Sequence, residues 1–126
     1  AYSVYSYFMP FIEAGPFQVA VQTKKSQVKQ AKELIQKTVA EFIQNGPTSK
    51  ELRRAKDFMI GGFPLRLDSN KKIIEYVSMM AFYKYPLDYL ETFTTRIDRI
   101  TAEEIKSAFQ RRVDMSKFST VIVGSE

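Results

Sequence analysis

The chain has 126 residues, a net charge of +5 and 44% hydrophobic residues, which is the profile of a globular protein rather than a disordered or fibrous one. No apolar run approaches the roughly 18 residues that a membrane-spanning helix needs. The sequence contains neither Cys nor His. That absence excludes disulfides, Cys-His and Ser-His catalytic pairs and zinc sites of the usual Cys/His type.

Two strands are predicted at the start of the chain. Residues 2–9 are rich in aromatic and β-branched side chains, which favours a strand. Residues 10–16 contain two prolines and a glycine and predict a connection. Apolar and polar side chains alternate over residues 17–23, which predicts a half-buried strand antiparallel to the first. Because the strand pattern starts at once and without a Met, we expect the chain to begin inside a longer protein.

The next two predicted elements are helices. Apolar residues at helical spacing follow Ser26, a suitable N-cap, and the Asn-Gly-Pro run at 45–47 predicts where this helix stops. A T-x-x-E capping box at 48–51 predicts the start of the second helix. Pro64 lacks the N–H that a helical bond would use, so this helix should kink or end there.

Three further helices and a last strand complete the prediction. The third helix follows the capping residues 68–70, and the Tyr-Pro pair at 85–86 ends it. A fourth, short helix is expected over about 88–98, and a second capping box at 101–104 starts the fifth. The apolar, β-branched run at 119–123 predicts a short final strand.

This order of two strands, about five helices and one more strand indicates an α+β fold in a single domain over residues 1–126. The two N-terminal strands and the C-terminal strand should form one antiparallel sheet that the helices cover on one face. The residues expected to be mostly buried are Val19, Val21, Leu34, Ile35, Phe42, Ile105, Phe109 and Ile122.

Few residues suggest chemistry. The neighbouring carboxylates Glu103 and Glu104 suit either acid–base work or the first turn of a helix, and the helix dipole favours the second interpretation. The basic charge would suit nucleic acid, but the first 23 residues contain no Lys or Arg among their aromatic side chains. A basic α+β module that binds nucleic acid is therefore one hypothesis for the function, but no motif in the sequence supports it.

Five segments in order resemble the pitrilysin family of bacterial zinc peptidases, which are insulinase-like or processing-peptidase-like enzymes. The opening AYSVYS resembles the end of the family segment R-x-K-x-G-L-A-Y-S-V-Y-S, and GFPLRLDSN at 62–70 resembles the run S/G-F-P-L-R-L-D-S/T-N. YKYPLDY at 83–89 resembles the step Y-x-x-P-L-D-Y, residues 97–105 resemble I-x-x-I/V-T-x-E-x-I/V, and VIVG at 121–124 resembles the final strand. The resemblance spans essentially the whole chain.

This resemblance implies that the chain is the latter half of a C-terminal domain that holds no zinc. Zinc would lie in an N-terminal domain on an inverted H-x-x-E-H motif, outside this chain. In active members an Arg and a Tyr of the second domain help to hold the substrate, and the Tyr hydroxyl helps to stabilise the oxyanion. The Tyr corresponds to Tyr2, whereas the Arg would precede Ala1. The other interpretation of Tyr2 is an aromatic residue that only packs on its strand.

The resemblance also implies the partners. They are a peptide substrate and the rest of a peptidase or a partner subunit, with no nucleic acid and no membrane span. In the alternative, the whole protein is a catalytically inactive subunit with a structural or substrate-binding role. A half-sheet with a bare edge should also make the chain associate with itself. A periplasmic or secreted bacterial location is expected from the resemblance only.

Overall fold

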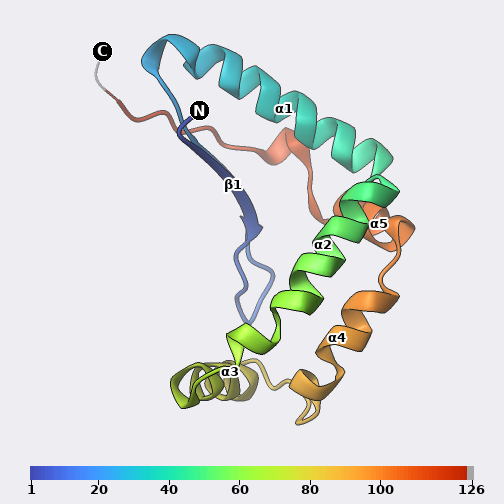
Figure 1. Ribbon diagram of the computed structural model, residues 1–126. Coiled ribbons are helices and arrows are strands. Elements are labelled where there is room, and N and C mark those ends of the chain that lie inside the picture. Colours follow the sequence, from blue (N-terminus) through green and yellow to red (C-terminus); the bar gives the residue numbers. More distant parts are fainter. Residues whose placement is uncertain (125–126) are drawn as a thin grey trace. The chain divides into compact units, whose positions relative to one another are not determined.

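The computed structural model describes residues 1–124, which divide into two units (Figure 1). The first unit combines residues 1–46 with the segment from Lys106 onward, and the second comprises Pro47–Ile105. Within the described residues no helix is both long and apolar enough to cross a membrane. The class is α+β, as the element order predicted, and the described residues contain two antiparallel strands and five α-helices.

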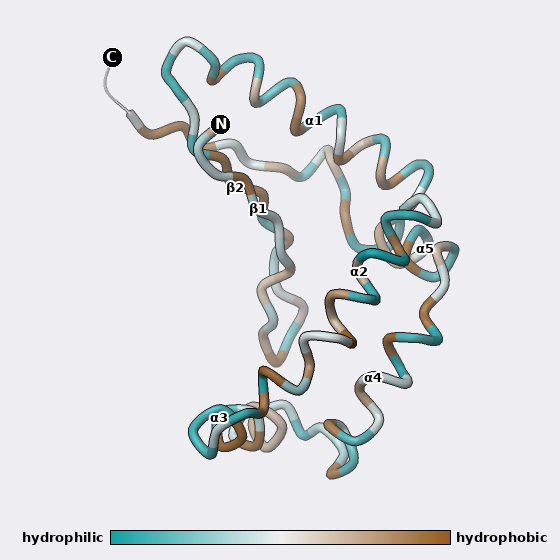
Figure 2. Tube along the Cα trace, in the orientation of Figure 1, coloured by the Kyte–Doolittle hydropathy of each residue, from teal (hydrophilic) through white to brown (hydrophobic). Residues whose placement is uncertain are grey.

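A β-hairpin opens the first unit. Strands β1 (Ser3–Phe8) and β2 (Phe17–Gln22) pair antiparallel, with Ser3 opposite Gln22 and Phe8 opposite Phe17. The sequence patterns predicted both strands, and the structure confirms them. Figure 2 shows hydrophobic residues along both strands.

The connection between the strands closes tightly at its base. The Met9 N–H donates to the Pro16 carbonyl oxygen at 2.9 Å, which extends the ladder by one pair beyond Phe8 and Phe17. Gly15 also lies close to Met9. A Cβ on Gly15 would overlap the Met9 carbonyl oxygen, and it would lie 3.1 Å from a ring carbon of Phe11. The absence of a side chain at position 15 is therefore a steric requirement of this turn.

Helix α1 (Val28–Asn45) follows the hairpin and begins differently from the prediction. Ser26 is not its N-cap, because a 3₁₀ turn over Lys25–Gln27 precedes the helix and Gln27 is the capping residue, without a side-chain hydrogen bond. Ser26 lies inside this 3₁₀ turn, so it is not the extended residue that a side-chain cap requires. The end of α1 is as predicted, with Gly46 at φ 70° and its N–H bonded to the Phe42 carbonyl oxygen.

Phenylalanine rings hold the first unit together. Phe109 of helix α5 (Ala102–Arg112) lies edge-on to three other rings, with centroid distances of 4.8–5.7 Å. These rings come from β1, β2 and α1 and belong to Phe8, Phe17 and Phe42. Val113, directly after α5, is only 5% exposed. Edge-to-face ring contacts of this kind add to simple burial, so this cluster is the core of the unit.

The prediction of a third strand near the C-terminus is wrong. Residues 119–123 form no strand, and the sheet in the described residues has only β1 and β2. Val121, Ile122 and Val123 are 84%, 63% and 93% exposed. Strand propensity expresses how well a residue fits a paired, half-buried surface, and here no neighbouring strand supplies that surface.

The second unit contains helices α2 (Ser49–Gly62), α3 (Asn70–Phe82) and α4 (Tyr89–Arg99). Helix α2 ends just before Pro64, as the sequence predicted, and Pro64 starts a 3₁₀ turn. Ser69 caps α3 by accepting the Lys72 N–H, also as predicted. In this unit α2 lies beside α4 (Figure 1), and the Phe63 ring next to α2 stacks on Phe93 of α4 at 4.5 Å.

Core burial agrees with the prediction only in part. Met80 and Val113 are the buried hydrophobic residues in residues 1–124, at 7% and 5% exposed. The apolar spacing of the third helix indicates Met80 as a core residue, whereas Val113 was not predicted. Leu34 is 62% exposed because burial on α1 follows Ala31, Ile35 and Val39, and Leu34 lies to one side of that stripe. Ile122 is exposed because its strand does not form. The other expected residues are partly buried: Val19, Val21, Ile35, Phe42, Ile105 and Phe109.

Both predicted capping boxes are present. The Thr48 N–H donates to the Glu51 carboxylate at 2.8 Å, and the Glu51 N–H donates to the Thr48 hydroxyl at 3.2 Å. Thr101 and Glu104 make the same two bonds, also at 2.8 and 3.2 Å. Each box holds the pKa of its glutamate below the ordinary value of 4.5. The larger cause is the hydrogen bond from the Thr backbone N–H, and the smaller one is the hydrogen bond from the Thr hydroxyl.

We therefore expect the two capping boxes to make the free energy of unfolding depend on pH. A lowered pKa in the folded state means that the stabilisation is present above pH 4.5 and is lost as the pH falls through the folded-state pKa. Glu51→Gln/Glu104→Gln keeps an acceptor in each box but removes the ionisation. Urea unfolding at neutral and at acid pH should show a smaller loss of stability for this variant than for the wild type. An equal loss in both proteins would contradict this assignment.

Candidate functional site

Tyr2, the predicted site residue, lies at the open end of the hairpin. Its N–H donates to the Gln22 carbonyl oxygen at 2.7 Å, although the strand register already places Ser3 opposite Gln22. Tyr2 and Ser3 are thus both opposite Gln22, so the regular pairing of the two strands ends at this point. The backbone of Tyr2 is anchored while its side chain is 72% exposed.

The Tyr2 hydroxyl makes no hydrogen bond to any described residue, in contrast to two other hydroxyls of the hairpin. The Ser3 hydroxyl donates to the Gln22 side chain and the Tyr7 hydroxyl to the Gln18 side chain, each at 3.2 Å. The Tyr7 ring also stacks on Tyr5 at 5.9 Å. Tyr2 therefore combines a fixed backbone with a phenol that remains available to an external acceptor.

A metal ion does not fit the residues present. The sequence has no Cys or His, and residues 1–124 contain no group of three or more Asp or Glu placed to hold a metal. Glu104 serves the capping box, as the helix-dipole interpretation of Glu103 and Glu104 predicted. A zinc ion such as the family resemblance implies thus has no ligand set in this part of the protein.

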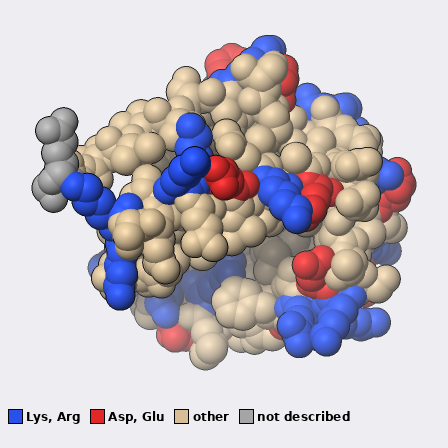
Figure 3. Space-filling view, turned by 90° about the horizontal axis from the view of Figure 1, so that it is seen from above, with Lys and Arg blue, Asp and Glu red and all other residues tan. Residues whose placement is uncertain are grey.

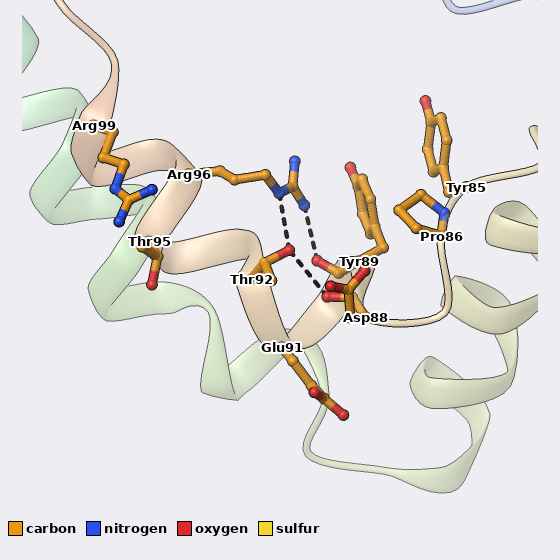
Figure 4. Close-up of a pocket in the computed structure, with 9 residues that line it drawn as sticks. All are labelled: Tyr85, Pro86, Asp88, Tyr89, Glu91, Thr92, Thr95, Arg96 and Arg99. Carbon is orange, nitrogen blue, oxygen red and sulfur yellow. Dashed lines mark hydrogen bonds between the residues drawn. The ribbon is translucent and has the colours of Figure 1, made fainter.

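A shallow depression of about 760 Å³ runs along α4 in the second unit (Figure 4). It is open to solvent, and its acidic and basic side chains balance one another. The residues that line it are Tyr85, Pro86, Asp88, Tyr89, Glu91, Thr92, Thr95, Arg96 and Arg99.

Arg96 is the most constrained side chain of this depression. It donates to the Thr92 hydroxyl at 3.1 Å and to the Tyr89 carbonyl oxygen at 2.8 Å, and its guanidinium lies 4.4 Å from the centre of the Tyr89 ring. Tyr89 in turn stacks on Tyr85 at 4.6 Å. Arg96 thus braces the first turns of α4, and the stack of Tyr89 on Tyr85 links this helix to the preceding loop, which are structural tasks. The sequence analysis missed this arrangement, although Tyr89, Phe93 and Arg96 have the spacing of one helix face.

Comparison with known proteins gives matches over most of the chain. A family model described as the peptidase M16 inactive domain matches residues 1–59. The non-peptidase homolog YmxG of Helicobacter pylori is 28% identical over 106 residues, and the uncharacterized zinc protease YmxG of Bacillus subtilis is 41% identical over 69 residues. These matches cover 84% and 55% of this chain but 24% and 17% of the two relatives.

A solved structure agrees with the fold as well. The crystal structure of a peptidase M16 inactive domain from Pseudomonas fluorescens has a TM-score of 0.82 and 36% sequence identity, and the match covers 92% of this chain and 27% of that one. The chain thus spans about a quarter or less of the length of each relative. Together with the family model and the Bacillus relative, this match shows that the chain belongs to the M16 (pitrilysin) peptidase family and corresponds to part of its C-terminal, inactive domain.

Proposed function

We propose that the chain helps to enclose a peptide substrate as part of the zinc-free C-terminal domain of an M16 zinc endopeptidase. Hydrolysis would take place at an N-terminal domain outside residues 1–126. The observation that carries this proposal is Tyr2, whose exposed hydroxyl is unpaired among the described residues while its backbone is fixed to Gln22. The absence of a metal ligand set in residues 1–124 and the name of the Bacillus relative, a zinc protease, support it.

In this proposal Tyr2 donates a hydrogen bond to the substrate oxygen that becomes negative during hydrolysis. Preorganised donors of this kind stabilise the transition state more than the ground state, because the charge they meet develops only on the reaction path. A donor carried on a separate domain reaches the substrate only when that domain closes over it, which keeps water out at the moment of reaction.

The proposal predicts how zinc and activity divide between the parts of the protein. The full-length protein should contain zinc that resists dialysis and should cleave peptides, whereas residues 1–126 alone should hold no stoichiometric zinc and cleave nothing. Metal analysis and mass spectrometry of peptide digests measure both properties. Chelator-resistant zinc in residues 1–126 would contradict the proposal, because no His or Cys is present to bind it.

A second candidate function is a catalytically inactive subunit that supports a zinc-bearing partner. The name of the Helicobacter relative, a non-peptidase homolog that matches 84% of this chain, favours it. The same metal analysis separates the two candidates. A full-length protein that binds no zinc but increases the activity of a zinc-bearing partner would establish the second candidate and refute the first.

We also propose that residues 1–126 associate with themselves. The two-stranded sheet of the described residues leaves backbone groups of β1 and β2 without a neighbouring strand, and Tyr2, Val4 and Phe8 are 72%, 64% and 45% exposed. Unpaired strand edges with apolar side chains favour pairing with another chain. Light scattering at about 100 µM should show a dimer or larger species, since this concentration lies at the weak end of interface affinities. A monomer at that concentration would contradict the prediction.

A further inference from the structure

We propose that the open end of the hairpin binds acidic peptide segments, so that the substrates of this protein are acidic peptides. The open end of the hairpin means here Tyr2, Val4, Lys24 and Lys25. This inference rests on the proposed function, because it names the substrate class for the surface that carries Tyr2.

The two lysines are placed beside Tyr2 by the backbone. The Tyr2 N–H is bonded to the carbonyl of Gln22, and Lys24 follows Gln22 by only two residues, which corresponds to at most about 7 Å of chain. A hydrogen bond from the Gln27 N–H to the Lys24 carbonyl oxygen, at 2.9 Å, holds Lys24 and Lys25 in the 3₁₀ turn that follows β2. The backbone of both lysines is therefore held within a few residues of the Gln22 carbonyl that anchors Tyr2.

These lysines are not neutralised locally. Lys24 and Lys25 are exposed, and neither has a carboxylate within 4.0 Å among residues 1–124. Lys29 and Lys32, which continue the basic run along α1, are also exposed and unpaired in the same part of the chain. At the left of Figure 3, on the side where β2 leads into α1, Lys and Arg side chains gather with no Asp or Glu between them.

The excess positive charge of the chain lies in the unit that carries Tyr2. Residues 1–46 and 106–124 contain nine Lys and Arg against four Asp and Glu. Residues 47–105 contain ten Lys and Arg against nine Asp and Glu and are nearly neutral. A positive surface around an exposed site raises the local concentration of anionic ligands and speeds their association.

Apolar side chains at the same place favour a peptide over a nucleic acid. Tyr2 and Val4 are 72% and 64% exposed, and an aliphatic side chain such as Val4 offers nothing to a phosphate backbone. A peptide that carries both acidic and apolar residues contacts the lysines and these two side chains together. Membership of a peptidase family points to the same class of ligand.

The test compares three fluorescent peptides of one length that share their apolar residues and carry Glu, Gln or Lys at the remaining positions. Their affinities for the full-length protein are measured by anisotropy at low and at high salt, while cleavage is followed by mass spectrometry. The Glu peptide should bind about tenfold more tightly than the Gln peptide at low salt and lose most of this advantage at high salt.

A matched pair of variants locates the effect. Lys24→Gln/Lys25→Gln should weaken binding of the Glu peptide about fivefold, which is the scale of two exposed ion pairs. Arg111→Gln/Arg112→Gln removes the same charge from the same unit at the end of α5. Phe109 of α5 contacts Phe8 at the other end of the hairpin, roughly 20 Å of strand from Tyr2, so this variant should bind as the wild type does.

Three results would overturn the inference. They are equal affinities for the Glu and Gln peptides, equal losses in the two double variants, and displacement of the Glu peptide by a single-stranded RNA that binds more tightly. Failure of the proposed function is a separate result. A protein that prefers the Glu peptide but cleaves none of the three would support the inference on the substrate class and refute the peptidase proposal, whereas cleavage without charge preference would do the reverse.

Discussion

Replacement of Tyr2 by phenylalanine in the full-length protein is expected to lower kcat by roughly 10²–10³, the usual cost of one oxyanion donor. The substitution removes only the hydroxyl, which makes no hydrogen bond within the described residues, and it retains the backbone bond to Gln22. Stability should therefore change little. KM should rise far less than kcat falls, because the lost interaction forms only in the transition state.

Tyr5→Phe is the matched control for this experiment. Tyr5 is 51% exposed and lies in β1, three residues after Tyr2, but its ring stacks on Tyr7 and no catalytic role is assigned to it. Steady-state kinetics with one peptide substrate should separate the two variants, with Tyr5→Phe close to the wild type. A near-normal kcat for Tyr2→Phe would show that Tyr2 is a packing residue and donates no hydrogen bond to the oxyanion.

Gly15→Ala is expected to destabilise the protein by about 2 kcal/mol or more, which is a large effect for one added methyl group. The new Cβ would overlap the carbonyl oxygen of Met9, a backbone atom that cannot rotate away. Relief of the overlap requires the turn to open, and the bond from the Met9 N–H to the Pro16 carbonyl would then be lost. Urea unfolding followed by far-ultraviolet circular dichroism measures the change.

Gly61→Ala provides the opposite result in the same assay. A Cβ at Gly61 meets no atom within 4 Å, and the residue lies inside α2. Alanine there should stabilise the protein by roughly 0.5–1 kcal/mol, because glycine is the poorer helix former. Equal effects of the two substitutions would show that the close approach at Gly15 does not exist in solution.

Local sequence signals predicted most of the secondary structure. The capping boxes at Thr48 and Thr101, the glycine at 46 and the proline at 64 act within a few residues of themselves, so their effect is visible in the sequence. The predicted strand at 119–123 failed because a strand needs a neighbour, and no local pattern reports whether one is present.

The sequence could predict only part of the candidate site. The resemblance identified Tyr2, but its fixed backbone depends on a contact with Gln22, twenty residues away in the chain. Its oxyanion role remains a prediction. Nothing in the sequence singled out Lys24 and Lys25, which look there like part of an ordinary solvated helix face. Only the hairpin register brings their backbone close to that of Tyr2.

The loop between α3 and α4 contains Lys84, which has a positive φ of 55°. A lysine in this region costs roughly 1 kcal/mol, so its own preferences oppose the turn. Contacts between rings compensate, because Tyr85 stacks on Tyr83 at 5.6 Å and on Tyr89 at 4.6 Å.

This balance has a kinetic consequence. A turn that local preferences oppose cannot nucleate folding, and it becomes stable only after the rings of Tyr83, Tyr85 and Tyr89 have met. We therefore expect the Lys84 turn to form on the native side of the folding barrier, so that substitutions in it change the unfolding rate more than the folding rate.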